Sequence, residues 1–158
     1  MKENDPIRFP VRKNPRLKDY DYTTQNYYFV TICTHNKQCL LGKPSELSAL
    51  GKIAEKHLQE IPTHFPGVIV DKYVVMPNHI HGILIFPGEN ANLSAVVGNY
   101  KAAVTRSVQK EYANRIIWQR SFHDHIIRNQ ADYERIWQYI EGNPGKWMED
   151  CFYVKEET

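Results

Sequence analysis

The chain has 158 residues, of which 42% are hydrophobic and 24% charged, and its formal net charge is +2. These values are typical of a globular protein with one domain that is large enough to bury a core. No apolar run approaches the ~20 residues that a membrane span needs, and the N-terminus is polar. We therefore expect a cytoplasmic protein without membrane contact. The three cysteines lack Cys-x-x-Cys spacing, which excludes the usual zinc ribbon and disulfide frameworks.

The charge is unevenly distributed along the chain. Residues 1–18 have a balance of +4, so the remainder has a balance of −2. A basic arm ahead of a nearly neutral body suits a polyanion such as nucleic acid, and it equally suits a solvated tail. The arm residues that we consider as contacts to a phosphate backbone are Arg12, Lys13 and Arg16.

Hydrophobic spacing predicts seven elements in the body of the chain. The predicted strands are 27–33, 68–76, 79–86 and 116–128, and the predicted helices are 48–61, 92–113 and 131–142. The first six elements follow the β-α-β-β-α-β order of the split βαβ unit, an α+β ferredoxin-like fold with an antiparallel sheet and two helices on one face. In that topology the first and third strands are the central pair. Pro62 and Pro144 are expected to end helices, and Pro144 is expected to move Asn143 out of helical geometry.

The third predicted strand carries two histidines on one face. Because side chains alternate along a strand, His79 and His81 share a side with Ile83 and Ile85. The other side has Ile80, Leu84 and Phe86. Two adjacent imidazoles on a buried strand are half of a metal site. The alternative for a short His-x-His motif is a pair of histidines that only form hydrogen bonds.

The last predicted helix places Tyr139 and Asn143 four residues apart, on one face and about one turn apart. Tyr139 is offset from the apolar stripe of Tyr133, Ile136 and Ile140 that packs the helix, so its side chain can point into a site. An amphipathic tyrosine at the surface is the alternative interpretation. Asn143 before a proline is also common turn chemistry at a helix end.

Two segments of the chain resemble one known family. Residues 77–83 (PNHIHGI) are similar to the His-hydrophobic-His strand of the single-tyrosine HUH endonucleases. Residues 139–147 (YIEGNPGKW) are similar to their nucleophile helix, in the Tyr-Ile-x-x-Asn-Pro form typical of the REP-associated tyrosine transposases and IS200-like relatives. Residues 118–120 and 124–129 also resemble that family. The resemblance implies three parts: a basic arm at 1–19, a catalytic domain at 20–150 and a tail at 151–158.

The resemblance also implies an activity and a site. The chain would be a transposase that nicks and joins single-stranded DNA bearing hairpins at element ends. His79, His81 and Asn143 would bind one divalent cation, Mg²⁺ or Mn²⁺, and Tyr139 would be the nucleophile that forms a 5′-phosphotyrosine. One branch of the family exchanges nucleophile helices between two subunits, and the REP-associated branch also permits a monomer. The sequence therefore leaves open a monomer or a homodimer, with the active site formed in cis or in trans.

Other polar residues of the body are candidate DNA contacts. His125 belongs to a second His-x-His motif with His123, and it either packs or contacts DNA. The basic candidates are Lys101, Arg106, Arg120 and Arg128.

Two other functions compete with the transposase. A His-x-His metallohydrolase with water as nucleophile is the first, although such enzymes need further ligands and Gly82 and Ile83 follow His81 here. The second is a non-catalytic nucleic-acid-binding module on a ferredoxin-like sheet. That module predicts aromatic residues for base stacking on the central strands, and the histidine strand has only Phe86.

Overall fold

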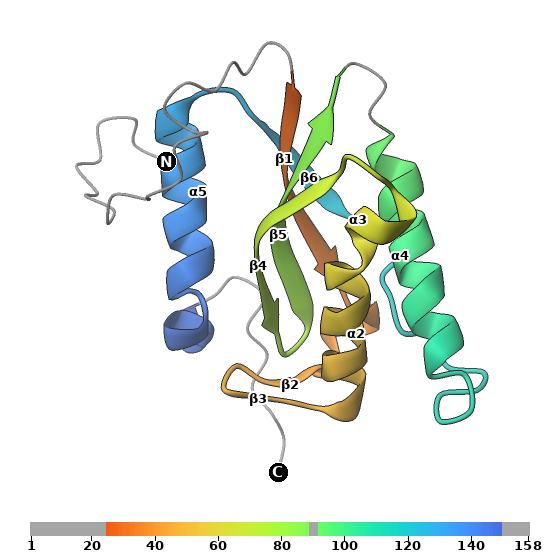
Figure 1. The fold of residues 1–158 in the computed structure, drawn as a ribbon. Helices are drawn as coiled ribbons and strands as arrows, with labels where there is room; N and C mark the ends of the chain where they lie inside the picture. Colours follow the sequence, from red (N-terminus) through yellow and green to blue (C-terminus); the bar gives the residue numbers. More distant parts are fainter. Residues whose placement is uncertain (1–24, 89–91, 150–158) are drawn as a thin grey trace.

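A computed structural model describes residues 25–88 and 92–149 (Figure 1). The basic arm at 1–19 and the tail at 151–158 lie outside these residues. In chain order the elements are β1 (Gln25–Cys33), η1 (His35–Lys37), β2 (Gly42–Lys43), β3 (Glu46–Leu47), α2 (Ala49–Gln59), α3 (Ile61–His64), β4 (Ile69–Met76), β5 (His79–Pro87), α4 (Leu93–Ser107), β6 (His123–Ile127), α5 (Gln130–Gly142) and η2 (Pro144–Glu149).

The four long strands form one antiparallel sheet in the order β4-β5-β1-β6. The predicted first and third strands, β1 and β5, are therefore the central pair, as the split βαβ topology requires. Helices α2 and α4 cover one face of the sheet, whereas α5 crosses the opposite face (Figure 1). The predicted ferredoxin-like α+β fold is confirmed, and α5 is the addition that closes the second face.

The central strand β5 separates two apolar clusters because its side chains alternate between the two faces. The large cluster lies between the sheet and the α2–α4 pair, and its members include Leu50, Leu58, Ile80, Leu84, Val97 and Val104. The small cluster lies under α5, and its buried members are Tyr27, Ile83, Ile85, Ile127, Tyr133 and Ile140. The alternation read from the sequence of this strand is therefore confirmed on both sides.

The first helix begins where the sequence predicts. Ser48 is the N-cap of α2, and its hydroxyl accepts the Gly51 amide at 3.0 Å. The helix ends at Gln59, and Pro62 then lies in the first turn of the short helix α3. A proline is tolerated there because the first turn needs no N–H donor.

Two predicted boundaries are wrong, and one small hairpin was not predicted. Helix α4 ends at Ser107 rather than at residue 113, because Val108 leaves the helix to bury its side chain in the large cluster. The last strand covers only His123–Ile127, whereas Trp118 makes an isolated bridge to Thr34. Residues 42–47, to which the sequence assigns no element, form the small hairpin of β2 and β3.

Within residues 25–88 and 92–149, no helix has the length and apolar character needed to cross a membrane. The cytoplasmic location stays a prediction.

Candidate active site

The two histidines of β5 lie side by side on the face that α5 crosses. His79 and His81 are 0% and 2% exposed, and their ring centroids are 4.5 Å apart. In the sheet register, Cys33 and Thr31 of β1 are opposite them on one side. Burial of two polar rings without hydrogen bonds would be costly, so the contacts of each ring nitrogen determine what the pair can do.

The Asn78 side chain orients His79. Nδ1 of His79 is 2.8 Å from Oδ1 of Asn78, whose amide nitrogen donates to the Lys37 carbonyl at 3.2 Å. That second bond determines which end of the amide faces His79, so Nδ1 must carry the proton and donate to Oδ1. The lone pair of the neutral ring is then on Nε2, the nitrogen available to a metal ion.

Thr31 also orients a histidine ring, that of His81, but its hydroxyl, unlike an amide oxygen, can either donate or accept. Its Oγ1 is 2.8 Å from Nδ1 of His81, and both side chains are buried. The other nitrogen, Nε2, faces the hydroxyl of Tyr139 at 3.5 Å. The ring of Phe29 lies 5.2 Å from His81 and 6.2 Å from Tyr139, so that these three rings enclose one corner of the site. Histidines that bind a metal usually have their other ring nitrogen held by a hydrogen bond of this kind.

Helix α5 brings Tyr139 to this corner. Tyr133 and Ile140 are buried in the small cluster, whereas Tyr139 is 44% exposed and its ring centroid is 5.2 Å from that of His81. The offset of Tyr139 from the packing stripe follows the helical period. The chain therefore places the candidate nucleophile beside one of its own candidate ligands.

Asn143 lies at the end of the same helix, and its predicted conformation is wrong. Its φ and ψ of −59° and −44° are helical despite the following Pro144, because the chain turns directly into η2. Its N–H donates to the Ile140 carbonyl at 3.3 Å, and its own carbonyl accepts the Lys146 amide at 3.0 Å. This continuous helical turn keeps the Asn143 side chain on the buried side of the chain.

The side chain of Asn143 suits a cation. It is 3% exposed, and within the described part of the chain its Oδ1 has no hydrogen-bond partner. Asn143 is four residues after Tyr139, and Trp147, four residues further on, has its ring 6.0 Å from that of His79. An amide oxygen without a partner among the described residues and two oriented imidazoles are donor types that suit a divalent cation with open positions for substrate. The described residues hold no cluster of three His, Cys, Asp or Glu, and Asn143 is the third ligand that the sequence predicts.

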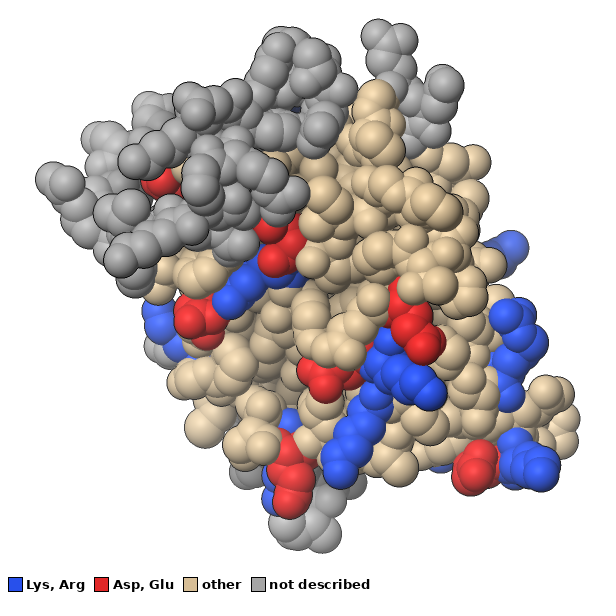
Figure 2. Space-filling model, viewed as in Figure 1, with Lys and Arg blue, Asp and Glu red and all other residues tan. Residues whose placement is uncertain are grey.

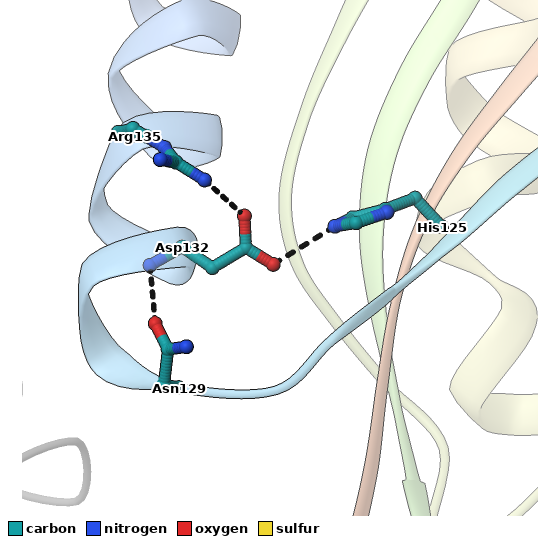
Figure 3. A network of polar contacts seen from close by, with 4 residues as sticks. All are labelled: His125, Asn129, Asp132 and Arg135. Carbon is teal, nitrogen blue, oxygen red and sulfur yellow. Dashed lines mark hydrogen bonds and ion pairs between the residues drawn. The ribbon is translucent and has the colours of Figure 1, made fainter. Parts of the chain in front are cut away.

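His125 contacts the start of α5 rather than the histidine pair (Figure 3). Its Nε2 is 2.8 Å from Oδ2 of Asp132, whose other oxygen accepts from Arg135 at 2.8 Å. The Asp132 amide donates to the N-cap oxygen of Asn129 at 2.8 Å. A carboxylate in the first turn also interacts favourably with the helix dipole. His125 thus holds the first turn of α5 against β6, and contact with DNA remains a prediction.

The structure does not bring the basic candidates together. Lys101 lies on α4, on the face away from the histidines, and its ammonium donates to the carbonyls of Gln119 and Ser121 at 2.9 and 2.8 Å. Burial lowers the pKa of Lys101 from its usual value. Arg106 is on the same helix, and Arg120 and Arg128 are exposed. The three candidates of the basic arm, Arg12, Lys13 and Arg16, lie outside the described residues.

The face seen in Figure 2 has basic and acidic side chains interspersed among the described residues. It therefore offers no single basic field to a polyanion.

Sequence reasoning missed four residues that shape the site. Thr31 and Phe29 lie on β1, and only the register of β1 against β5 shows that they face the histidines. Asn78 and Trp147 were given no role in the site. Both lie inside the two motifs, so proximity in sequence was the available signal.

The fold and the site together define a class: ferredoxin-like α+β proteins with paired histidines on a central strand and a tyrosine on an added helix. The family model described as "Transposase IS200 like" matches residues 21–143. The chain therefore belongs to the IS200-like transposase family and is an enzyme of the transposase class.

The chain is also similar to two curated proteins and to one solved structure. The chain is 34% identical over 168 residues to an uncharacterized protein of Haemophilus influenzae, covering 90% of this chain and 93% of that protein. It is 31% identical over 81 residues to the REP-associated tyrosine transposase of Escherichia coli, covering 49% of this chain and 44% of that protein. A solved structure of a REP-associated tyrosine transposase bound to a REP hairpin has the same fold, with a TM-score of 0.64 and 24% identity over 78% of this chain and 68% of the other.

Proposed function

We propose that the protein nicks and rejoins single-stranded DNA through a covalent bond between Tyr139 and the 5′-phosphate of the cut strand. The observation that supports this most directly is the position of the Tyr139 hydroxyl, 3.5 Å from Nε2 of His81 in the same chain. A tyrosine outside the apolar stripe of its helix and a buried, oriented imidazole pair are the two groups that such a reaction requires.

His79, His81 and Asn143 would hold a divalent cation, Mg²⁺ or Mn²⁺. When bound, this ion supplies Lewis-acid stabilisation to the scissile phosphate and favours the phenolate form of a nearby tyrosine. Asn78 and Thr31 orient the two imidazoles through Nδ1, at 2.8 Å each.

The main obstacle is the acidity of the nucleophile. The reference pKa of a tyrosine is ~10, so holding it as a phenolate at pH 7 costs about 4 kcal/mol. The reaction forms a bond between the Tyr139 oxygen and phosphorus and breaks the bond from phosphorus to the 3′ oxygen. The phenol loses its proton and the departing 3′ oxygen gains one. Because the new bond is also a phosphodiester, a DNA 3′-hydroxyl can reverse the step and join another strand.

The substrate is single-stranded DNA with a hairpin near the cut. Membership of the transposase family and the hairpin bound by the solved relative support this choice. A continuous duplex would have to be unpaired before one strand could reach the corner formed by His81, Tyr139 and Phe29. A single strand avoids the free-energy cost of that unpairing.

A cleavage assay tests the proposal. A hairpin-bearing single strand labelled at its 3′ end should give a labelled protein adduct that survives SDS in the presence of Mn²⁺. The adduct should disappear on chelation, and in Tyr139→Phe the strand should still bind without forming it. Tyr112→Phe is the matched control, because Tyr112 packs against the large cluster on the other side of the sheet.

The same assay separates the alternatives. A metallohydrolase would release free ends with or without the Tyr139 hydroxyl, and a binding module would leave the strand intact. Either result across a panel of hairpin strands contradicts the proposal.

The contact of Tyr139 with His81 of its own chain also supports an active site formed in cis, for which a monomer suffices. Mixing Tyr139→Phe with a His81 variant should then give no adduct. Recovery of activity in the mixture would instead show a homodimer with sites formed in trans.

A further inference from the structure

The edge strand β4 has a bulge on the side of the sheet that carries the active site. Val70 pairs with Leu84, and the next paired residue is Lys72, opposite Ile83, so Asp71 is the extra residue. In a regular strand Val70 and Lys72 would face the same side of the sheet. Here Val70 lies opposite Leu84 of the large cluster and Lys72 lies opposite Ile83 of the small cluster, so the two face opposite sides. A bulge of this kind turns two consecutive side chains, which would otherwise alternate, toward the same face of the sheet.

Both residues of the bulge contact α5. The hydroxyl of Tyr133 donates a hydrogen bond to Oδ2 of Asp71. The ammonium of Lys72 lies 4.1 Å from the ring centroid of Trp137 and forms an ion pair with Glu141. A regular strand would have sent one of these two side chains to the opposite face.

The three residues of α5 that meet the bulge are spaced by four. Tyr133, Trp137 and Glu141 advance by only about 40° per step around the helix, so they form one stripe that faces β4. Tyr139 lies two residues from Trp137, about 200° around the axis, on the opposite flank. The helix is thus held at β4 on one flank and presents Tyr139 to His81 and Phe29 on the other.

We propose that Asp71 and Lys72 are positioning residues that set the rotation of α5 about its own axis and thereby aim the Tyr139 hydroxyl. The small cluster also holds α5 on the sheet, but apolar contacts are not directional and tolerate rotation. Hydrogen bonds and ion pairs depend on direction and therefore specify the angle.

The required accuracy shows why the angle matters. A tyrosine hydroxyl lies about 9 Å from a helix axis, so a rotation of about 20° moves it by about 3 Å. Reacting atoms must approach to within about 3–3.5 Å, and an error of 1 Å can cost about 100-fold in rate. A rotation too small to unfold the helix is therefore enough to stop the reaction.

This inference rests on the proposed role of Tyr139, and rates of adduct formation in a single turnover test it. Tyr133→Phe and Asp71→Ala should each slow the step by about 10- to 100-fold while the affinity for the strand changes by less than about twofold. Asp71→Asn keeps an acceptor oxygen and should stay within about threefold of the wild type. The double variant Asp71→Ala with Tyr133→Phe should be no slower than the worse single variant.

Glu134→Gln is the matched control. Glu134 lies beside Tyr133 on α5 but is exposed, and among the hydrogen bonds described it bonds only to Gln130. The rate of adduct formation in Glu134→Gln should therefore equal that of the wild type. Equal rates for wild type, Tyr133→Phe and Asp71→Ala would overturn the inference, and so would a loss that appears only in strand affinity.

A second measurement is independent of activity and separates this inference from the function itself. In the full-length protein, proton NMR contacts between the rings of Tyr139 and Phe29 should be present in the wild type and in Glu134→Gln. They should weaken in Tyr133→Phe while α5 stays helical. If no strand yields an adduct, the proposed function fails, yet these contacts still decide whether the bulge aims Tyr139. Unchanged contacts in Tyr133→Phe would refute the inference.

Discussion

The two faces of the sheet are built differently. The face under α2 and α4 is closed by the large cluster, whereas the face under α5 has only the small cluster at one end. The polar side chains buried in the described part of the chain are Thr31, Thr34, Asn78, His79, His81 and Asn143. Of these, the histidines, Thr31 and Asn143 belong to the α5 face, and Asn78 orients a histidine from the adjoining turn.

Stability and chemistry depend on different faces of the sheet. Apolar burial is the main source of folding free energy, so the large cluster carries most of the stability. Buried polar groups cost free energy unless they are satisfied, and they concentrate where chemistry needs them. The protein thus keeps a stable layer on one side of β5 and a polar, more costly layer on the other.

The largest effect is expected for a ligand of the cation. His81→Gln should reduce adduct formation by at least about 10³-fold, because one ligand accounts for several kcal/mol of transition-state stabilisation. Its melting temperature should fall less than that of Leu84→Ala. Titration with Mn²⁺ should show the loss of binding directly, and unchanged affinity would remove His81 from the ligand set.

Adjacent residues of β5 offer the sharpest test of the comparison. Leu84 and Ile83 are both buried but point into the large and the small cluster, respectively. Leu84→Ala should lose about 3 kcal/mol of unfolding free energy and leave the adduct rate unchanged well below its melting temperature. Ile83→Ala should lower both the unfolding free energy and the rate of adduct formation, because it removes apolar contacts between the sheet and α5. Equal rates for the two variants would contradict a division between the faces.

A smaller effect is expected for the residue that orients His81. Thr31→Val keeps a similar shape but removes the oxygen that lies 2.8 Å from Nδ1 of His81. Loss of a hydrogen bond that orients a metal-binding histidine should weaken Mn²⁺ affinity by about 10- to 100-fold. The measurement is calorimetric titration of both proteins, and an unchanged affinity would show that the ring needs no such support.

The smallest effect concerns the stable face and its pH dependence. Tyr100 of α4 is buried and donates to the Ala54 carbonyl of α2 at 2.7 Å, so Tyr100→Phe should cost about 1 kcal/mol at pH 7. Burial raises the pKa of Tyr100 well above its usual value, and the pKa of Tyr73 is raised for the same reason.

The sign of the pH effect follows from that direction. Above pH ~10 the unfolded chain ionises its tyrosines while folded Tyr100 stays neutral, so stability is full below pH ~10 and falls above it. Between pH 9 and 11 the wild type should lose about 1 kcal/mol more unfolding free energy than Tyr100→Phe. Urea denaturation of both proteins at each pH measures this difference. If the unfolding free energies of the two proteins changed equally with pH, Tyr100 would ionise in the folded protein as it does in the unfolded chain.

Short-range patterns were sufficient to predict much of the molecule. The alternation of β5, the helical spacing of α5 and the cap at Ser48 depend on residues close in sequence, and the structure has each of them. The element order was enough to predict the central pair of strands. The predicted end of α4 and the predicted conformation of Asn143 were wrong, because packing and the following turn outweighed local preference.

Local patterns in the chain are thus enough to predict the class of fold, the pair of imidazoles and the tyrosine that lies outside the packing stripe of its helix. The orientation of the imidazoles by Thr31 and Asn78, the buried Oδ1 of Asn143 and the bulge of β4 that faces α5 follow only from the folded chain. Periodicity acts over a few residues. The pairing of β1 with β5 brings together Thr31 and His81, 50 positions apart, and the contact of α5 with β4 brings together Asp71 and Tyr133, 62 positions apart, so only the folded chain reveals them.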